Sequence, residues 1–155
     1  MATKPIPEGY HTATPYIIVD NGRKAIDFYK QAFNAKELMR FEDPAHGTLG
    51  HAEVKIGDSV IMLSDETPDH EWRSPRAFGG TPVGLMLYVD DVDKVFARAI
   101  KAGATEKKAV TDQFYGDRSG TVTDPFGHVW TIATHKEDLS PEEMHRRFRA
   151  AVQHT

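Results

Sequence analysis

The sequence predicts an α+β fold in which two paired βαβββ modules form a curled, cup-like mixed sheet, followed by a C-terminal helix. One observation is an internal repeat, because Val19-Asp20 recurs as Val89-Asp90 and Gly50 recurs as Gly120, each 70 positions later. Another is that each copy reads as an apolar strand, an amphipathic helix, a turn and further strands. Two copies exclude a solenoid and favour a pseudo-twofold domain with a cleft shared by its halves.

The first module is expected over residues 10–66. A β-rich strand at 14–20 precedes Asn21, a residue type that caps helix N-termini, and apolar residues at helical spacing follow. Asn34 can adopt the left-handed conformation that ends a helix. The remaining strands of this module are expected at 36–42, 51–56 and 59–63.

Residues 67–81 are acidic and then rich in Pro and Gly, so they are expected to form the crossover between the modules. The second module is expected over 82–136, with a helix that Asp91 caps and Gly103 ends. A capping-box pattern at Ser140 predicts a C-terminal helix over 140–153. The strands expected in the second module are 83–89, 105–110, 120–123 and 129–134, with a loop at 113–120.

Composition limits both the domain organisation and the function. A length of 155 residues suits a single domain over 1–155. A net charge of −4, with 19 dispersed Lys and Arg residues, argues against nucleic acid or a membrane surface as partner. Cysteine is absent, which excludes disulfides and thiolate metal sites. No apolar run reaches membrane-spanning length and no signal-peptide core is visible, so a cytoplasmic protein is expected.

Several short motifs occur in a fixed order along the two modules. They are Tyr16-Ile17-Ile18-Val19-Asp20, Ala25-Ile26-Asp27-Phe28-Tyr29, Gly50-His51-Ala52-Glu53, Tyr88-Val89-Asp90-Asp91-Val92, Gly116-Asp117-Arg118 and Asp124-Pro125-Phe126-Gly127-His128. In this order, the chain resembles the vicinal oxygen chelate superfamily, and within it the PhnB-like branch of the glyoxalase/bleomycin-resistance/dioxygenase proteins. The resemblance implies the paired-module fold and a homodimer in which cups are completed across subunits.

The resemblance also implies a divalent metal held by His, Glu or Gln on the first and last strand of each module. The matching positions fall near Ala13 or Thr14, and at Met62, Gly84 and Thr131. None of these residues is a usual ligand for a transition metal. The sequence therefore predicts no metal at the family position and no other cofactor.

His51 and Glu53 are the candidate catalytic residues. They are two positions apart on one expected strand, so their side chains point to the same face. An imidazole beside a carboxylate could bind a metal or act as an acid/base pair. The alternative is a solvated strand face, since polar alternation is ordinary in a sheet with one exposed side. The sequence leaves both interpretations open.

The expected loop at 113–120 and the aromatic residues add further candidates. Arg118 offers a planar fork for a carboxylate or phosphate, and Tyr115 could stack on a planar ligand, unless they form a local ion pair and an aromatic plug. Trp72 in the crossover is either a lid over the cleft or a surface anchor. We expect the ligand site in a cup lined by Tyr16, His51, Glu53, Tyr115, Arg118 and Trp130.

The leading hypothesis is a glyoxalase/bleomycin-resistance-like protein that binds a small planar or anionic molecule without the family-typical metal. The alternative is a metal-dependent lyase, isomerase or dioxygenase with a displaced divalent metal near His51 and Glu53. A third class is an interaction module that uses the terminal helix. The sequence does not decide whether a reaction is catalysed, and the expected partners are a small-molecule ligand and a second copy of the chain.

Overall fold

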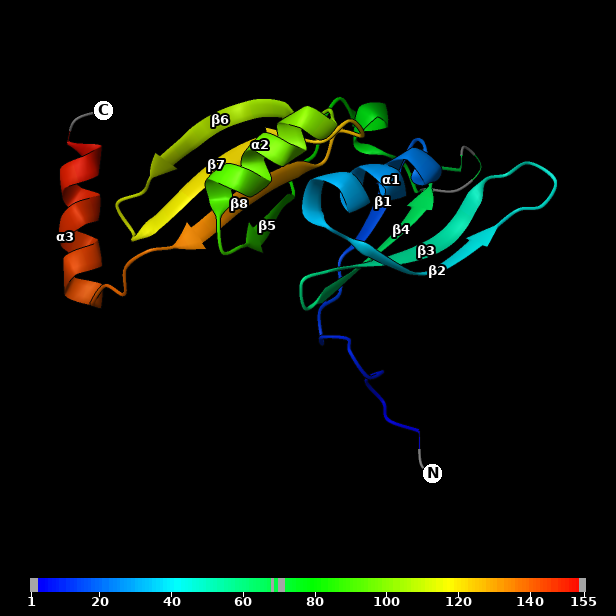
Figure 1. The fold of residues 1–155 in the computed structure, drawn as a ribbon, viewed down its shortest axis with the longest axis horizontal. Helices are drawn as coiled ribbons and strands as arrows, with labels where there is room; N and C mark the ends of the chain where they lie inside the picture. Colours follow the sequence, from blue (N-terminus) through cyan, green and yellow to red (C-terminus); the bar gives the residue numbers. More distant parts are fainter. Residues whose placement is uncertain (1–2, 68, 70–71, 154–155) are drawn as a thin grey trace.

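A computed structural model describes residues 3–67, 69 and 72–153 and confirms the predicted α+β fold (Figure 1). The first βαβββ module contains β1 (Tyr16–Val19), α1 (Gly22–Phe33), β2 (Lys36–Glu42), β3 (Leu49–Ile56) and β4 (Ser59–Asp65). The second contains β5 (Gly84–Tyr88), α2 (Val92–Ala102), β6 (Thr105–Asp112), β7 (Asp117–Thr123) and β8 (Val129–His135). A short 3-10 helix, Pro75–Phe78, lies in the crossover, and α3 (Pro141–Val152) follows the second module. Residues 68, 70 and 71 of the expected crossover lie outside the described residues.

The eight strands form two separate four-stranded sheets, ordered β1-β4-β3-β2 and β5-β8-β7-β6. In each sheet the first strand of the module runs parallel to the last, and the other neighbours are antiparallel. The helix of each module packs on one face of its sheet. We call the other face of each sheet, which none of the helices in the described residues covers, the open face.

The helices begin and end where the sequence predicts. The side chain of Asn21 accepts a hydrogen bond from the backbone N–H of Lys24, and Asn34 ends α1 with a left-handed φ of 55°. In the second module Asp91 caps α2, and Gly103 ends it at a φ of 117°. Such a φ is strained for residues with a Cβ atom, which explains glycine there.

The two modules are joined through α1 and α2, which contact each other, and through an aromatic cluster between α1 and β8. Tyr29 and Phe33 of α1 lie 5.5 and 5.0 Å from the ring of Trp130, measured between centroids. The carboxylate of Asp124 accepts hydrogen bonds from the Tyr29 hydroxyl at 2.7 Å and from Trp130 Nε1 at 2.9 Å. The predicted Asp124–His128 turn is therefore also part of the contact between modules.

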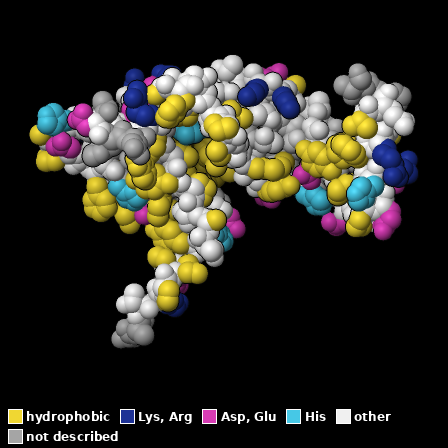
Figure 2. All heavy atoms as spheres, turned by 180° about the vertical axis from the view of Figure 1, so that it is seen from behind, with side chains coloured by type: hydrophobic (Ala, Val, Ile, Leu, Met, Phe, Trp, Pro, Cys, Tyr) yellow, Lys and Arg dark blue, Asp and Glu magenta, His cyan; other side chains and the backbone are white. Residues whose placement is uncertain are grey.

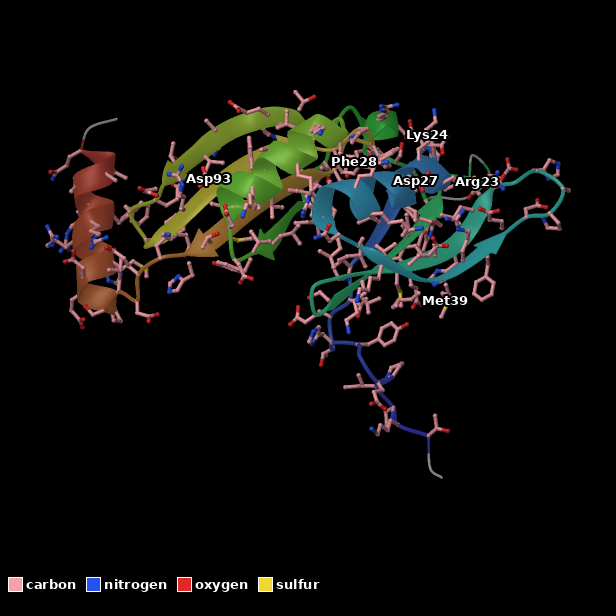
Figure 3. The ribbon with its side chains drawn as sticks, viewed as in Figure 1. Arg23, Lys24, Asp27, Phe28, Met39 and Asp93 are labelled. Atoms are coloured by element: carbon pink, nitrogen blue, oxygen red, sulfur yellow. The ribbon has the colours of Figure 1, made fainter. Side chains whose placement is uncertain are left out.

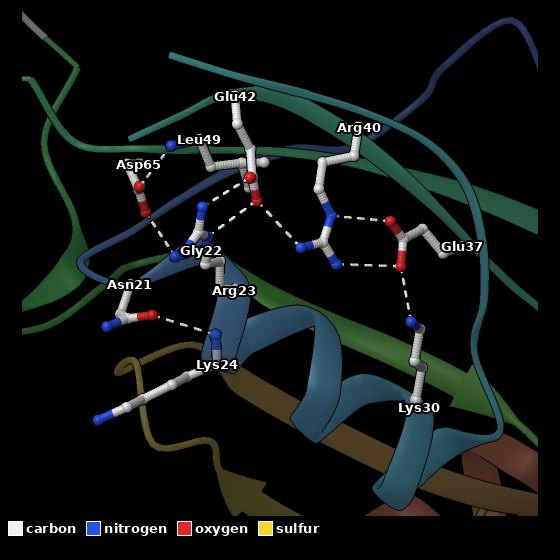
Figure 4. Close-up of polar contacts among 10 residues, drawn as sticks. All are labelled: Asn21, Gly22, Arg23, Lys24, Lys30, Glu37, Arg40, Glu42, Leu49 and Asp65. Carbon is white, nitrogen blue, oxygen red and sulfur yellow. Dashed lines mark hydrogen bonds and ion pairs between the residues drawn. The ribbon is translucent and has the colours of Figure 1, made fainter. Parts of the chain in front are cut away.

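Ion pairs hold the outer strand of the first sheet to α1 (Figure 4). Arg23 of α1 pairs with Glu42 at 2.7 Å, and Lys30 pairs with Glu37 at 2.6 Å. Arg40 links the two carboxylates, at 2.8 Å from Glu37 and 3.0 Å from Glu42. These charged side chains of β2 face the helix, so the opposite side of β2 is left to apolar residues.

Helix α3 stands at the outer end of the second module, and none of its described residues is buried (Figure 1). One half of the predicted capping box forms, since the Ser140 hydroxyl accepts a hydrogen bond from the N–H of Glu143, whereas the Glu143 carboxylate turns toward Arg146 and Arg147. The carboxylate of Glu143 pairs with Arg146 and Arg147, which lower its pKa to about 2. No helix in the described ranges is both long and apolar enough to span a membrane.

Candidate functional site

The open face of the first sheet carries a connected set of polar side chains. His51 and Glu53 project from β3 on this face. The alternate residues, Ala52 and Val54, are fully buried on the helix side. Tyr16 of β1 reaches the same set across β4, because Tyr16 and Glu53 are both register partners of Met62. The shared face expected for His51 and Glu53 is therefore present.

These side chains form one hydrogen-bonded series, which we call the polar chain: Tyr16, His51, Glu53 and Tyr10. The Tyr16 hydroxyl lies 2.9 Å from His51 Nδ1, and His51 Nε2 lies 3.2 Å from Glu53 Oε1. The hydroxyl of Tyr10 donates to the other carboxylate oxygen of Glu53, and this bond raises the pKa of Tyr10. Every hydrogen-bonding atom of the His51 ring and of the Glu53 carboxylate thus has a partner.

The polar chain fixes the tautomer of His51. An ionised carboxylate can only accept, so the His51 nitrogen that faces Glu53 must carry a proton. In a neutral imidazole the other nitrogen then accepts, which means that Tyr16 donates its hydroxyl proton to Nδ1. Glu53 is only 5% exposed, so the chain runs from a half-exposed phenol to a buried carboxylate.

Aromatic side chains surround the exposed end of the polar chain. The ring of Trp72 meets Tyr16 edge-on at 5.0 Å, and Phe41 stacks near His51 at 6.3 Å. Met39 is the register partner of Glu53 and projects from β2 on the same open face (Figure 3). Seen from behind, hydrophobic side chains gather over the first module and again beside α3 (Figure 2).

A cavity of about 570 Å³ opens next to this aromatic group. Tyr16 and Trp72 form one side of it, and the other lining residues come from the ends of β3 and β4: Leu49, Gly50, Ser64, Asp65 and Thr67. Trp72 therefore borders the cavity from the crossover. A mostly apolar hollow with a few hydrogen-bonding groups has the character of a small-molecule site.

Trp130 does not line the open face, contrary to expectation. It is fully buried on the helix side of β8, where it packs on Tyr29 and Phe33. Its register partner is Val122, another buried residue of the helix side. Because side chains alternate between the two faces along β8, Trp130 belongs to the core.

Arg118 also does not lie where the sequence analysis expected it, in the ligand cup. Because β7 begins at Asp117, the expected loop at 113–120 is too long, and strand alternation sends Arg118 to the helix side. Its guanidinium donates two hydrogen bonds of 2.8 Å to Asp93 of α2 and one of 3.2 Å to Asp112. Asp93 lies in the first turn of α2 (Figure 3), and Arg118 lowers the pKa of this carboxyl.

Tyr115 remains in the loop between β6 and β7, away from the polar chain. It packs edge-on against Phe114 at 5.1 Å, and Phe114 in turn lies 5.5 Å from Phe148 of α3. Of the six residues expected around the ligand, the structure brings together Tyr16, His51 and Glu53 and separates Tyr115, Arg118 and Trp130 from them.

Arg118→Ala is expected to lower the melting temperature slightly and to leave ligand binding on the open face unchanged. The physical reason is that Arg118 is an ion-pair partner of Asp93 and Asp112 on a solvent-accessible surface. Melting curves at low and high salt should show a difference from wild type that shrinks as salt screens the pairs. Arg149→Ala in α3 is the matched control. If Arg118→Ala weakens ligand binding and leaves the melting temperature unchanged, Arg118 belongs to the binding site after all.

A second polar cluster, which the sequence did not predict, lies on the open face of the second sheet. Asp117, only 4% exposed, accepts hydrogen bonds from the Tyr88 hydroxyl at 2.9 Å and from His135 Nδ1 at 2.7 Å. The other ring nitrogen of His135 lies 3.0 Å from Asp138, and the two carboxylates raise the pKa of His135, chiefly through Asp117. His135 thus lies between two acids.

The positions that correspond to the family's metal ligands do not form a metal site. Ala13 and Thr14 precede β1, Met62 lies on β4, Gly84 begins β5 and Thr131 lies on β8, so the side chains at these positions offer hydroxyl and thioether groups but no imidazole or carboxylate. The Thr131 hydroxyl is engaged with Thr121 at 3.1 Å. Within the described residues, no group of three or more His, Asp and Glu side chains is arranged to hold a metal ion. These residues do not fit the family's divalent metal.

Comparison with known proteins shows the family to which the chain belongs. The family model for the glyoxalase/bleomycin resistance protein/dioxygenase superfamily matches residues 10–132. The chain belongs to this superfamily. The predicted resemblance is therefore confirmed, and it covers both modules but not α3.

Individual relatives agree with this assignment. An uncharacterized protein of Mycobacterium bovis is 42% identical over 134 residues, which is 84% of this chain and 88% of the relative. The crystal structure of TioX from Micromonospora sp. ML1 superposes with a TM-score of 0.62 at 25% identity and covers 84% of this chain and 100% of TioX. A PhnB protein from Bacillus cereus has a TM-score of 0.63 at 16% identity and shares the fold over 80% of this chain and 99% of its own.

Proposed function

We propose that this protein binds a small planar molecule at the edge of the first sheet, in the cavity that Tyr16 and Trp72 border beside the ends of β3 and β4. The observation that carries the proposal is the junction of an aromatic pair with a buried polar chain at the edge of a cavity of about 570 Å³. Aromatic rings supply stacking area at little entropic cost, and the polar chain supplies directional hydrogen bonds. The proposed binding uses no metal.

The charge of the site favours a neutral ligand over an anionic one. The anionic ligand was expected because of Arg118, whose guanidinium instead binds Asp93 and Asp112 on the helix side. Glu53 lies buried on the open face, and Asp65 contributes to the cavity lining. A carboxylate on the ligand would be repelled by these two negative charges.

Coumarin and coumarin-3-carboxylate form a matched pair of planar probes for this proposal. We expect coumarin to bind more tightly than its carboxylate, and Trp72→Ala to weaken coumarin binding about tenfold, the loss of roughly one aromatic stacking contact. Equilibrium dialysis measures the dissociation constants. Phe148→Ala, which removes an exposed aromatic ring of α3, is the matched control. Coumarin binding that is absent, or equally weakened by both variants, would contradict the proposed site.

We also propose that the protein forms a homodimer in which a second copy covers the open faces. Several large apolar side chains on these faces are solvent-exposed, including Phe41 at 63%, Tyr88 at 64% and Met86 at 46%. Exposed apolar side chains that gather on one face of a protein often mark an interface with another chain. The outer edges of β1 and β5 are also unpaired with other described strands, and a dimer contact would protect them.

Sedimentation at micromolar concentration is expected to show a species of twice the 17.3 kDa chain mass. Met86→Glu should shift it toward the monomer, because a charge would be buried without a partner in the contact. Lys107→Glu, an exposed charge change on β6, is the control and should not alter the mass. A 17.3 kDa species for the unmodified chain would contradict the proposed dimer.

A metal-dependent lyase, isomerase or dioxygenase is the second candidate, and the closeness of His51 and Glu53 is the observation that favours it. Their facing atoms are 3.2 Å apart, which would suit two ligands of one ion. However, Tyr16 and Tyr10 already occupy the remaining His51 and Glu53 positions, so an ion would have to displace at least one of these hydrogen bonds. Binding without metal therefore has the stronger support.

A further inference from the structure

Going beyond binding, we propose that the polar chain is a base triad that removes a proton from a carbon atom of a planar molecule. In this triad Tyr16 is the group that faces the molecule, His51 receives the proton and Glu53 holds His51 in place. The inference rests on the proposed binding of planar molecules in the cavity beside Tyr16 and Trp72.

The geometry meets the requirements for such a relay. A proton-transferring group must be hydrogen-bonded to a base, and the base to a third group that orients it. Tyr16 lies 2.9 Å from His51 Nδ1, and His51 Nε2 lies 3.2 Å from Glu53. Tyr10 donates to the second oxygen of Glu53 and so fixes the carboxylate. The Tyr16 end of the series is the end that lines the cavity.

The proton step balances without an oxidant or reductant. A C–H bond of the bound molecule breaks, and its proton forms a new O–H bond with the Tyr16 oxygen. The original phenolic proton of Tyr16 moves to His51 Nδ1. The electron pair of the C–H bond stays in the molecule, where it forms a π bond and either moves onto a conjugated oxygen or expels a leaving group. The resulting imidazolium is stabilised by the Glu53 carboxylate, because the two charges lie adjacent and Glu53 is shielded from water.

The second polar cluster shows why composition alone is insufficient. Tyr88, His135 and Asp117 repeat the same residue chemistry on the other open face, but Tyr88 donates directly to Asp117 rather than to the imidazole. Both nitrogens of His135 face carboxylates, one from Asp117 and one from Asp138. No ring nitrogen of His135 is available to accept a proton from Tyr88. Only the first cluster has the order phenol, imidazole, carboxylate, and His135 is therefore a matched control for His51.

The probe for this activity is 5-nitrobenzisoxazole, a neutral planar molecule with one acidic C–H bond. Removal of the C3 proton by a base lets the C–H electron pair form a nitrile while the N–O bond breaks, and the released cyanonitrophenolate is coloured. We expect saturable turnover that is slower when C3 carries deuterium. His51→Gln and Tyr16→Phe should each lower kcat at least tenfold, whereas His135→Gln should leave it unchanged.

Glu53 is a positioning residue, and its test separates orientation from binding. Glu53→Gln should lower kcat while KM stays close to that of the wild type, because the variant keeps the shape of the site but loses the charge that stabilises the imidazolium. Melting curves of all variants show whether each is folded. Glu53→Asp, which keeps the charge, should recover part of the lost rate.

The outcomes distinguish this inference from the proposed binding. If coumarin does not inhibit turnover of the benzisoxazole, and the rate does not saturate with benzisoxazole concentration, the proposed binding site is wrong. If the probe saturates and coumarin competes, but His51→Gln turns over as fast as the wild type, the base triad is wrong and the binding site stands. A Tyr16→Phe variant with undiminished kcat would assign the proton transfer to His51 alone and overturn the role of Tyr16.

Discussion

Asp124→Ala is expected to lower the free energy of unfolding by at least about 3 kcal/mol, because several buried donors lose their acceptor at a cost of about 1–3 kcal/mol each. Asp124 is 4% exposed, and one of its oxygens accepts from the Tyr29 hydroxyl and the Trp130 indole. The other accepts from the backbone N–H groups of Phe126 and His128, both at 2.9 Å. The substitution leaves these four donors buried without an acceptor.

Urea denaturation of matched variants measures this effect. Tyr29→Phe removes one hydrogen bond but keeps the ring, so it should cost about 1 kcal/mol, the net contribution of a typical hydrogen bond. Asp27→Asn on the exposed side of α1 is the control and should leave the unfolding midpoint unchanged. If Asp124→Ala unfolds at the same midpoint as Asp27→Asn, the carboxylate does not join the modules as its contacts indicate.

The effect should extend beyond local stability because Asp124 connects the modules. Tyr29 belongs to α1 of the first module, whereas Trp130 belongs to β8 of the second. Both meet at one carboxylate oxygen within the aromatic cluster. Tyr29 is fully buried, and this burial together with the nearby charge of Asp124 raises its pKa well above the usual range. The fixed relation of α1 to β8 therefore depends on this residue.

The fold could be predicted from sequence because its signals are local and occur twice. Strand alternation around Ala52 gave the shared face of His51 and Glu53, and the cap residues Asn21 and Asp91 marked the two helix starts. The duplication also extends to a detail that was not predicted. The N–H of Gly22 at the start of α1 donates to Asp65 of β4, and that of Val92 at the start of α2 donates to Thr134 of β8.

The site was only partly predictable, because the face of a strand residue depends on register. Asp117 and Arg118 belong to β7, and neighbouring side chains of a strand point to opposite faces of the sheet. In the observed register Asp117 lies on the open face and Arg118 on the helix side. Tyr10 was missed because it lies before the first strand and reaches Glu53 across 43 positions of chain. Trp72 comes from the crossover, where no periodic pattern indicates what an aromatic side chain contacts.

Gly22→Ala is expected to destabilise the protein by about 1–3 kcal/mol, the usual range for overpacking a core. A Cβ atom at Gly22 would lie 2.2 Å from Cδ2 and 2.9 Å from Cβ of Leu49, a fully buried residue. The surroundings are held rigidly, because Asp65 accepts from the N–H groups of both Gly22 and Leu49 (Figure 4). The clash therefore has to be relieved by moving Leu49 or by tilting the start of α1.

This relief also connects Gly22 to the proposed binding site, since Leu49 and Asp65 line the cavity beside Tyr16. Gly22→Ala should accordingly weaken coumarin binding as well as lower the unfolding midpoint. Gly84→Ala is the matched control, because a Cβ atom there would meet no atom within 4 Å. Combining Gly22→Ala with Leu49→Ala should cost less than the sum of the two single changes, since the new methyl group would occupy space that the leucine leaves. Additive costs would mean that the close approach of Gly22 to Leu49 does not determine the packing of α1 against the floor of the cavity.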